Sequence, residues 1–374
     1  MTPALRFPDL LSEPSRFARW PAWLSAFVLA LFLGFLAWGT LHPPVAADLA
    51  DKPVHALKGS NIPPDPAGDD VLLYRAMADG VRHGGNYYAV AAPLLRDNNY
   101  PLRPFVTFRL PTLTVFLAYV PQPLALALMC LLVGAVIMAW TVRLAPALRT
   151  AKICSYASLF IMMNSLTAFS PALIVFHEGW AALLIALSLA LYRKERWWPS
   201  LLLALLAVMI RELALPFVLL MGALALLDRR WREFAAWSAV TVLFAIALWF
   251  HAHAVWSVTT VADPASPGWN ASGGWRFVVA AVQNSTMFNL APGPVTQILV
   301  PFALLGWAAW SGPTGTRVFL WLAGFSTAMM LFGRPDNFYW AVMITPVLFV
   351  GLLFAPAALR DLIASIRRRP SPGI

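Results

Sequence analysis

The chain has 374 residues, of which 60% are hydrophobic and 12% are charged, and its mean hydropathy is +0.69. A soluble domain is about half apolar and about a quarter charged, so this composition excludes an ordinary soluble protein and indicates a polytopic membrane protein. The net charge of +10 comes from short basic clusters between apolar spans. That pattern is typical of topology signals and lipid headgroup contacts rather than of nucleic-acid binding. Cys130 and Cys154 lie in or beside apolar spans, which argues against a disulfide framework or a zinc site.

The first apolar run, residues 21–41, follows a short basic segment at 1–20 that we expect in the cytoplasm. At about 20 residues, the run is longer than the hydrophobic region of a signal peptide, although Val45-Ala46-Ala47 resembles a signal-peptidase site. We therefore expect a retained transmembrane helix, with a cleaved signal peptide as the alternative. A helix needs about 20 apolar residues to cross the hydrocarbon core. The further candidate segments are 112–142, 152–170, 171–191, 199–227, 234–256, 296–312, 316–332 and 338–356.

The basic clusters favour one threading of these segments. With a cytoplasmic N-terminus, every cluster falls on the cytoplasmic side, as the positive-inside rule requires. Segment 199–227 begins and ends at basic turns and carries Arg211-Glu212 at its middle, so it is predicted to be two short helices that cross and return. Their apex is expected to face a cavity on the outer side. The sequence thus predicts about nine to ten membrane segments, within 21–41, 112–256 and 296–356, with outer loops at 42–111 and 257–295 and a basic cytoplasmic tail at 357–374.

The stretch GDDVLLYRAMADGVRHGGNYY, residues 68–88, is the most polar part of the first outer loop. Apolar residues follow Asp69 and Asp70 with the spacing of a helix. This helix is too short and too charged to span a membrane, so we expect a juxtamembrane helix along the outer surface. A capping role explains one aspartate but not two. At least one of them is therefore predicted to act at the mouth of an outward-facing cavity.

Other polar side chains are predicted to converge on the same face. His177 and Glu178 interrupt an apolar span near its outer end, and ionisable groups within membrane segments point to function. Arg211 is either satisfied by Glu212 or positioned to grip a phosphate. Arg334 either extends toward the membrane interface or serves as a second such cation. The candidate sugar-binding side chains are Tyr74, Tyr87, Tyr88, Asn98 and Tyr100.

In this order, the motifs resemble those of the GT-C superfamily of membrane glycosyltransferases, which use polyprenyl-phosphate-linked sugars. The acidic pair opens a juxtamembrane helix in GDDVLLYRAMADG, and a glycine-aromatic step follows in GGNYY. A proline-rich entry to the next helix follows in NNYPLRPFVTFRLPTL, and FHEGWAALLIALSLALYRKERWWPSLLLALLAVMIRELAL carries the later acidic residue, basic turn and Arg-Glu step. The resemblance covers about residues 20–230, and the rest of the chain matches only as further membrane helices.

The resemblance implies an all-α, GT-C-like helical bundle that transfers a sugar, with inversion, from a polyprenyl phosphate to an acceptor hydroxyl. The acceptor is a lipid or a glycan, and the active site lies on the outer face of a bacterial inner (cell) membrane. Asp69 is then the catalytic base, and Asp70 positions the acceptor or a divalent cation, Mg²⁺ or Mn²⁺. Arg211 and Arg334 would bind the donor phosphate. His177, Glu178 and Glu212 complete the substrate-binding candidates.

Two other classes of protein stay open. A transporter or flippase of a lipid-linked saccharide would also place cations in a cavity, but transporters usually show matching broken helices in two halves. The sequence shows one broken segment, 199–227. A structural assembly subunit would explain neither that segment nor the acidic pair.

Overall fold

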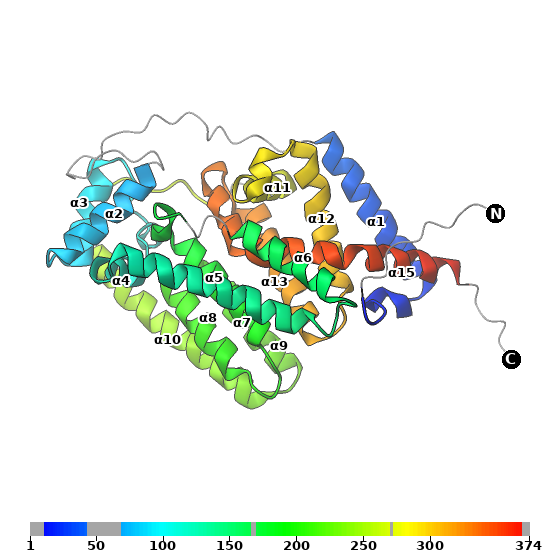
Figure 1. Cartoon of the computed structure of the whole chain (residues 1–374). Coiled ribbons are helices and arrows are strands. Elements are labelled where there is room, and N and C mark those ends of the chain that lie inside the picture. Colours follow the sequence, from blue (N-terminus) through cyan, green and yellow to red (C-terminus); the bar gives the residue numbers. More distant parts are fainter. Residues whose placement is uncertain (1–10, 43–68, 166–169, 270–271, 369–374) are drawn as a thin grey trace.

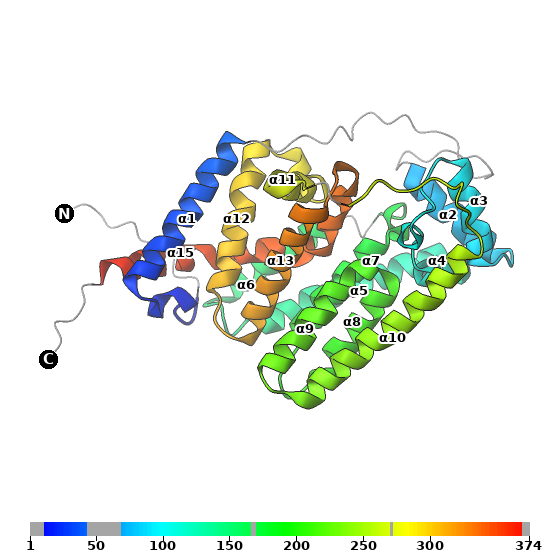
Figure 2. The same ribbon diagram turned by 180° about the vertical axis from the view of Figure 1, so that it is seen from behind.

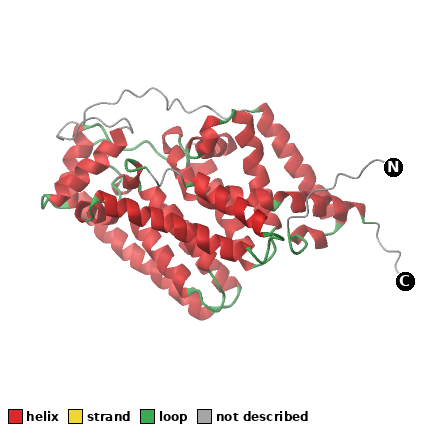
Figure 3. Ribbon diagram, viewed as in Figure 1, coloured by secondary structure: helices red, strands yellow, loops and turns green. Residues whose placement is uncertain are grey.

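The computed structural model describes residues 11–42, 69–165, 170–269 and 272–368. These residues form helices, and their only β-type contacts are two isolated bridges, Leu11–Leu148 and Arg103–Ala265 (Figure 3). The predicted all-α fold class is confirmed. The α-helices are α1 (Ala22–Leu41), α2 (Asp69–Arg82), α3 (Tyr87–Asp97), α4 (Pro111–Tyr119), α5 (Gln122–Leu144), α6 (Ala151–Asn164), α7 (His177–Leu191), α8 (Trp198–Ile210), α9 (Leu215–Leu227), α10 (Trp231–Trp256), α11 (Gly274–Asn284), α12 (Gly293–Ala309), α13 (Pro313–Phe332), α14 (Thr345–Leu348) and α15 (Ala355–Arg367). The 3-10 helices are η1 (Arg16–Arg19), η2 (Phe105–Thr107), η4 (Leu173–Val175), η5 (Glu212–Ala214), η6 (Met287–Leu290), η7 (Pro335–Met343) and η8 (Phe349–Leu353).

Four of the described helices, α1, α5, α10 and α13, are long and apolar enough to cross a membrane. A fifth span is added if η7 and residues 345–353, which meet at a bend of 55°, count as one. The predicted nine to ten segments are not confirmed, because the remaining apolar helices are short. Helices α8 and α9, for example, have 13 residues each, or about 20 Å of helix against a hydrocarbon core of about 30 Å. The long apolar helices are compatible with an integral membrane protein.

The basic turns that separate the apolar segments lie together at one end of the bundle, which we call the basic end. Arg143 Nε donates to the carbonyl of Ala190 (2.8 Å), and Arg230 donates to the carbonyl of Lys194. Arg317 Nη2 lies 3.7 Å from an Asp228 carboxylate oxygen, so α13 reaches the same turns. The clustering agrees with the predicted threading, in which all these turns share one side of the membrane.

The segment 199–227 is divided as predicted. Helix α8 leaves the basic end, and α9 returns to it beside α10 (Figure 2). The break falls at Arg211, whose extended backbone (φ −144°, ψ 117°) ends α8 and leads into η5. The structure therefore places Arg211-Glu212 at the apex, far from the basic end.

Two other expected single spans are broken. Segment 112–142 is divided between α4 and α5 at Val120-Pro121, since a proline nitrogen has no hydrogen to continue the helical ladder. Segment 338–356 is divided among η7, α14 and η8 and bends at Ile344. The start of the expected tail at 357–374 belongs to α15, which packs against α1 and α12 (Figure 1).

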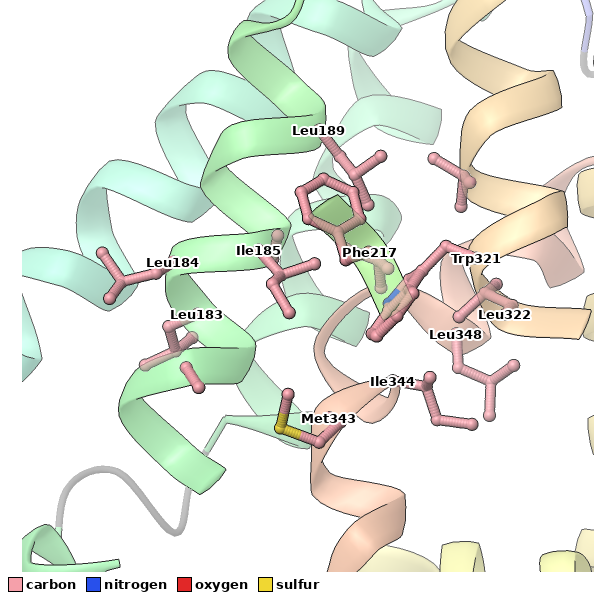
Figure 4. Packing of buried hydrophobic residues seen from close by; sticks show 14 of the residues in the cluster. Leu183, Leu184, Ile185, Leu189, Phe217, Trp321, Leu322, Met343, Ile344 and Leu348 are labelled. Carbon is pink, nitrogen blue, oxygen red and sulfur yellow. The ribbon is translucent and has the colours of Figure 1, made fainter. Parts of the chain in front are cut away.

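The core is built from side chains of several helices that are distant in sequence. Leu183 and Leu189 of α7, Phe217 of α9, Trp321 of α13 and Leu348 of α14 are all buried and point into one cluster (Figure 4). This cluster fixes the position of α7 relative to η7 and η8. The start of α7 and the helix η7 both line the cavity described below. The packing of this apolar cluster therefore sets the geometry of that cavity.

The first outer loop contains two helices rather than one. Helices α2 and α3 pack on each other and on α4, at the end of α10 that is far from the basic end (Figures 1 and 2). The predicted juxtamembrane helix is α2, and Asp69 and Asp70 are its first two described residues. Both lie inside the first turn, where the helix dipole favours negative charge. Gly68, the residue before them, lies outside the described residues.

Candidate functional site

A cavity of about 1210 Å³ lies at the end of the bundle opposite the basic end. Its walls come from the start of α2, the chain around Tyr100 to Arg109, the start of α7, η5, the end of α11 and η7. Most of the candidate residues predicted from the sequence line it, namely Asp69, Asp70, Tyr74, Tyr87, Tyr100, Glu178, Arg211, Glu212 and Arg334. Their convergence comes from segments that are distant in sequence.

One face of α2 forms the cavity wall that carries the acidic pair. Asp70 and Tyr74 are four residues apart and therefore lie one helical turn from each other on the same face. The opposite face, with Arg75 and Asp79, lines a different cavity of about 960 Å³ between α2, α3 and α4. Helix α2 thus separates the two cavities, and its acidic end belongs to the larger one.

Asp70 is held in place by a tyrosine. The Tyr100 hydroxyl donates to Asp70 Oδ1 over 2.6 Å. Burial, together with the Asp70 charge, raises the pKa of Tyr100, so this hydroxyl keeps its proton and remains a donor. Asp70 therefore has a fixed orientation at the cavity rim.

Arg211 is enclosed by two carboxylates. Its Nε lies 2.6 Å from Glu178 Oε1, and its Nη1 contacts Glu212 Oε1. The Arg211 and Glu178 side chains are 2% and 4% exposed. The Nε–Oε1 approach lacks hydrogen-bond geometry, so we describe it as an ion pair. Of the two roles that the sequence allows for Arg211, the structure therefore favours the ion pair over the phosphate ligand. Glu178 is a second partner that the sequence did not indicate, because it lies far from Arg211 in the chain.

Arg334 is also paired. Its Nε and Nη2 donate to both oxygens of Asp336 (3.2 and 2.9 Å), and its Nη1 donates to Ser266 Oγ (3.2 Å) and to the Pro267 carbonyl (2.6 Å). The guanidinium also lies over the ring of Trp269, 5.8 Å from its centre. Arg334 therefore connects the start of η7 to residues 266–269, and these contacts leave it little capacity to bind a phosphate.

Residues 257–269, which we call the strap, run from α10 across to this arginine. At the middle of the strap, Asp263 accepts hydrogen bonds from Arg96 at 2.6 and 3.0 Å, and its carbonyl accepts from Arg103 Nε at 2.9 Å. Ser266 and Trp269 line the cavity. The strap therefore joins the α2–α3 side of the cavity to the η7 side.

Sequence reasoning missed Arg109, which also lines the cavity. Its Nε donates to the Tyr74 hydroxyl (3.2 Å) and its Nη2 to the Tyr339 hydroxyl (3.0 Å). Among the described residues, no carboxylate lies within ion-pair distance of Arg109, so it is the cavity arginine that has only neutral partners. Its signal in the sequence is a cation just before an apolar helix on the side where the positive-inside rule disfavours one.

Three predicted site residues do not line this cavity. The Tyr88 hydroxyl contacts His251 Nδ1 at 3.1 Å, and Asn98 Nδ2 donates to the Leu94 carbonyl at 2.8 Å. His177 is buried, with its ring packed edge-on against Tyr74 at 5.5 Å between centres. Tyr87 does line the cavity, but its hydroxyl donates to the Arg109 carbonyl (2.8 Å) and so positions that residue. These side chains support the site from outside or from its wall.

A divalent cation would find few protein ligands here. The part of the chain that the structure describes contains no group of three or more His, Cys, Asp or Glu residues arranged to hold a metal. Asp69 and Asp70 alone fit a Mg²⁺ or Mn²⁺ ion only if substrate phosphate oxygens complete its coordination, as Mg²⁺ commonly allows. The aspartate pair is therefore the place where such an ion would bind together with substrate.

Comparisons with models of known protein families, with curated proteins and with solved structures gave no match. The site must be interpreted from its own geometry and from the motif resemblance described above.

Proposed function

We propose that this protein is an inverting glycosyltransferase that moves a sugar from a polyprenyl phosphate to an acceptor hydroxyl. The single observation that carries the proposal is that Asp69 and Asp70 line the same cavity as Arg109, an arginine with only neutral partners among the described residues. A carboxylate that accepts a proton and a guanidinium that stabilises a departing phosphate are the two groups that this reaction requires. The order of the GT-C-like motifs supports the same interpretation.

The chemistry follows from these two groups. The acceptor oxygen attacks the anomeric carbon, and its proton passes to the Asp69 carboxylate. The bond between the anomeric carbon and the phosphate oxygen breaks, and its electron pair leaves with the phosphate. The phosphate therefore gains a negative charge, which a guanidinium in the cavity wall stabilises. Attack on the side opposite the leaving group inverts the anomeric configuration.

Asp70 has a different role in this proposal. Its contact with Tyr100 fixes its direction, so it is suited to position the acceptor hydroxyl or, with donor phosphate oxygens, a Mg²⁺ or Mn²⁺ ion. When bound, such an ion would add positive charge beside the leaving phosphate. Membrane lipids surround the protein, the acceptor is a lipid or glycan, and the active site faces outward from a bacterial inner membrane.

A transporter or flippase of a lipid-linked saccharide is the second candidate. The structure supplies an observation in its favour, because the bend between η7 and residues 345–353 is a broken segment in the C-terminal part of the chain, in addition to the break between α8 and α9. Paired broken helices are typical of transporters. The acidic pair at the cavity rim is what favours the enzyme.

Purified protein in lipid nanodiscs separates the two candidates. We would supply polyprenyl phosphates that carry radiolabelled hexoses or pentoses, with membrane glycolipids as acceptors, with and without EDTA. The enzyme proposal predicts labelled glycolipid and free polyprenyl phosphate. A transporter instead moves the labelled lipid across proteoliposome membranes and leaves the sugar–phosphate bond intact, which would overturn the enzyme assignment.

A further inference from the structure

The cavity contains a group of hydrogen-bond donors of which the sequence indicates only Tyr74, as a candidate sugar-binding side chain. It consists of Arg109, which precedes α4, Tyr74 of α2, and Tyr339 of η7. All three side chains line the cavity. Arg109 and Tyr339 are 230 positions apart in the chain, so only the folded structure brings them together.

The direction of the hydrogen bonds within this group leaves three donors available. A guanidinium has hydrogens to donate and no lone pair to accept, so both tyrosine oxygens must be the acceptors in their contacts with Arg109. Asn337 Nδ2 also donates to the Tyr339 oxygen, over 3.4 Å. Each hydroxyl therefore retains its own hydrogen for another acceptor. Arg109 Nη1 has no hydrogen-bond partner among the described residues, so its two hydrogens are available as well.

The charge distribution of the cavity makes this group the best position for an anion. Arg211 is neutralised by Glu178 and Glu212, and Arg334 by Asp336. Arg109 contacts only neutral hydroxyls, so its positive charge is not cancelled by a contacting carboxylate among the described residues. A charge-assisted contact from an anion would engage a guanidinium and two O–H groups at once.

We propose that Arg109, Tyr74 and Tyr339 form an oxyanion site that binds one phosphate group of a lipid phosphate. Three donor groups suit the three non-bridging oxygens of a phosphate monoester, whereas a carboxylate offers two oxygens. This inference rests on the proposed function for the role of that phosphate as the leaving group. The site is distinct from the one predicted from the sequence, because it excludes Arg211 and Arg334 as direct phosphate ligands.

Tyr74 is suited to this role because it stays protonated. Burial raises the pKa of Tyr74 above its ordinary value, with the charge of Arg109 acting in the opposite direction and those of Asp70 and Glu178 adding to the rise. A hydroxyl donor in this environment is neutral through the physiological pH range. It therefore donates to the phosphate both in the donor lipid and after the sugar has left.

Binding of a sugar-free lipid tests the site without requiring transfer. The probe is C55 polyprenyl monophosphate, titrated into purified protein in nanodiscs, with affinity measured by microscale thermophoresis. We expect Arg109→Met to weaken binding by roughly 100-fold, and Tyr74→Phe and Tyr339→Phe to weaken it by roughly tenfold each, as for lost hydrogen bonds to a charged group. Arg109→Lys, which keeps the charge but not the fork of donors, should fall between these limits.

Two matched variants serve as controls. Arg75→Met makes the same change on the other face of α2, where Arg75 lines the smaller cavity. Tyr119→Phe removes a hydroxyl from a side chain on α4 that is 68% exposed. Both should bind the lipid phosphate like the wild type. If Arg109→Met fails to fold, the two tyrosine variants still test the site.

The experiment distinguishes lipid phosphate from inorganic phosphate as the ligand. It also distinguishes failure of the oxyanion site from failure of the proposed transfer reaction. Inorganic phosphate should compete, but far more weakly than the lipid; binding of inorganic phosphate without the lipid phosphate would overturn the lipid assignment. Wild-type affinity in Arg109→Met and in both tyrosine variants, or no binding of lipid phosphate by the wild type, would overturn the site. Loss of binding in these variants, in a protein that transfers no sugar, would leave the site standing and remove the proposed transfer reaction.

Discussion

Arg211 has a different environment in the folded protein from the one its sequence neighbours indicate. The chain places it beside Glu212, but the fold adds Glu178 from α7 at 2.6 Å. Breaking a buried charge pair by removing one partner costs about 3–5 kcal/mol, because the remaining charge is left uncompensated. The pairing therefore favours a structural role that holds α7 to the break between α8 and α9.

This role predicts a specific pattern of stability. Arg211→Met should destabilise the protein by about 3–5 kcal/mol, seen as a lower melting temperature of the purified protein in detergent. Adding Glu178→Gln should restore part of that loss, because it removes one of the stranded charges. If Arg211→Met instead melts like the wild type and only lipid-phosphate binding falls, then Arg211 is the phosphate ligand first expected from the sequence.

The sequence indicates the aspartate pair but not the contacts of Arg109 with Tyr74 and Tyr339, for a physical reason. Asp69 and Asp70 stand out locally, since they open a helix in a polar stretch of an apolar chain. The contact between Arg109 and Tyr339 depends on how η7 packs against the first outer loop, which no local pattern contains. The same holds for Glu178 and Arg211, whose pairing needs α7 and α8 side by side.

Among the elements, the strap is the part whose role the sequence left open. Its residues carry no recognisable motif, yet it is anchored at two points. Arg96 and Arg103 hold its middle at Asp263, and Arg334 holds its end near Trp269. The strap thus sets the distance between the wall that carries the acidic pair and the wall formed by η7.

The sequence predicts some of the breaks in the membrane helices but not all of them. The charges at the centre of segment 199–227 predict its break. Pro121 lies inside the predicted span 112–142, where no charge indicates the break that the structure shows.

Asp263 provides the test of the strap. Its side chain is 5% exposed, and Asp263→Asn should weaken the anchor by about 1–3 kcal/mol, as expected for hydrogen bonds to a charged group. Amide hydrogen exchange across residues 257–269 should then be faster by roughly 5-fold to 150-fold. Asp97→Asn, an exposed change at the end of α3, is the matched control. Equal exchange in the two variants would show that the strap does not depend on Asp263.

The anchor also has a defined pH dependence. The hydrogen bonds from Arg96 are the main reason that the pKa of Asp263 lies well below its ordinary value. Since the folded pKa is depressed, the stabilisation is fully present above the ordinary value of about 3.9 and is lost as the pH falls through the folded pKa. Wild-type protection of the strap, corrected for intrinsic exchange, should thus be constant from pH 5 to pH 8. A loss of protection within that range would contradict this assignment.

At the scale of the whole molecule, the basic turns gather at one end and the cavity lies at the other. This polarity is what the positive-inside rule would produce in a protein whose cavity faces outward. In a background with Cys130→Ala and Cys154→Ala, new cysteines at positions 97 and 265 should react with a membrane-impermeant thiol reagent on intact cells. Cysteines at positions 195 and 229, both exposed at the basic end, should react only after the cells are lysed. The reverse pattern would place the cavity on the cytoplasmic side.

In the proposed reaction, Asp69 takes the acceptor proton during sugar transfer. The most direct measurement is the transfer rate of Asp69→Asn in nanodiscs with labelled polyprenyl-phosphate sugar, beside its affinity for C55 polyprenyl monophosphate. Asparagine has the size of aspartate and is also well tolerated at the N-terminus of a helix. The variant should therefore fold and bind the lipid phosphate like the wild type. Its transfer rate should fall by roughly 10²- to 10⁴-fold, the usual contribution of general base catalysis. Transfer at the wild-type rate in Asp69→Asn, with Asp70→Asn equally active, would show that neither aspartate is the catalytic base.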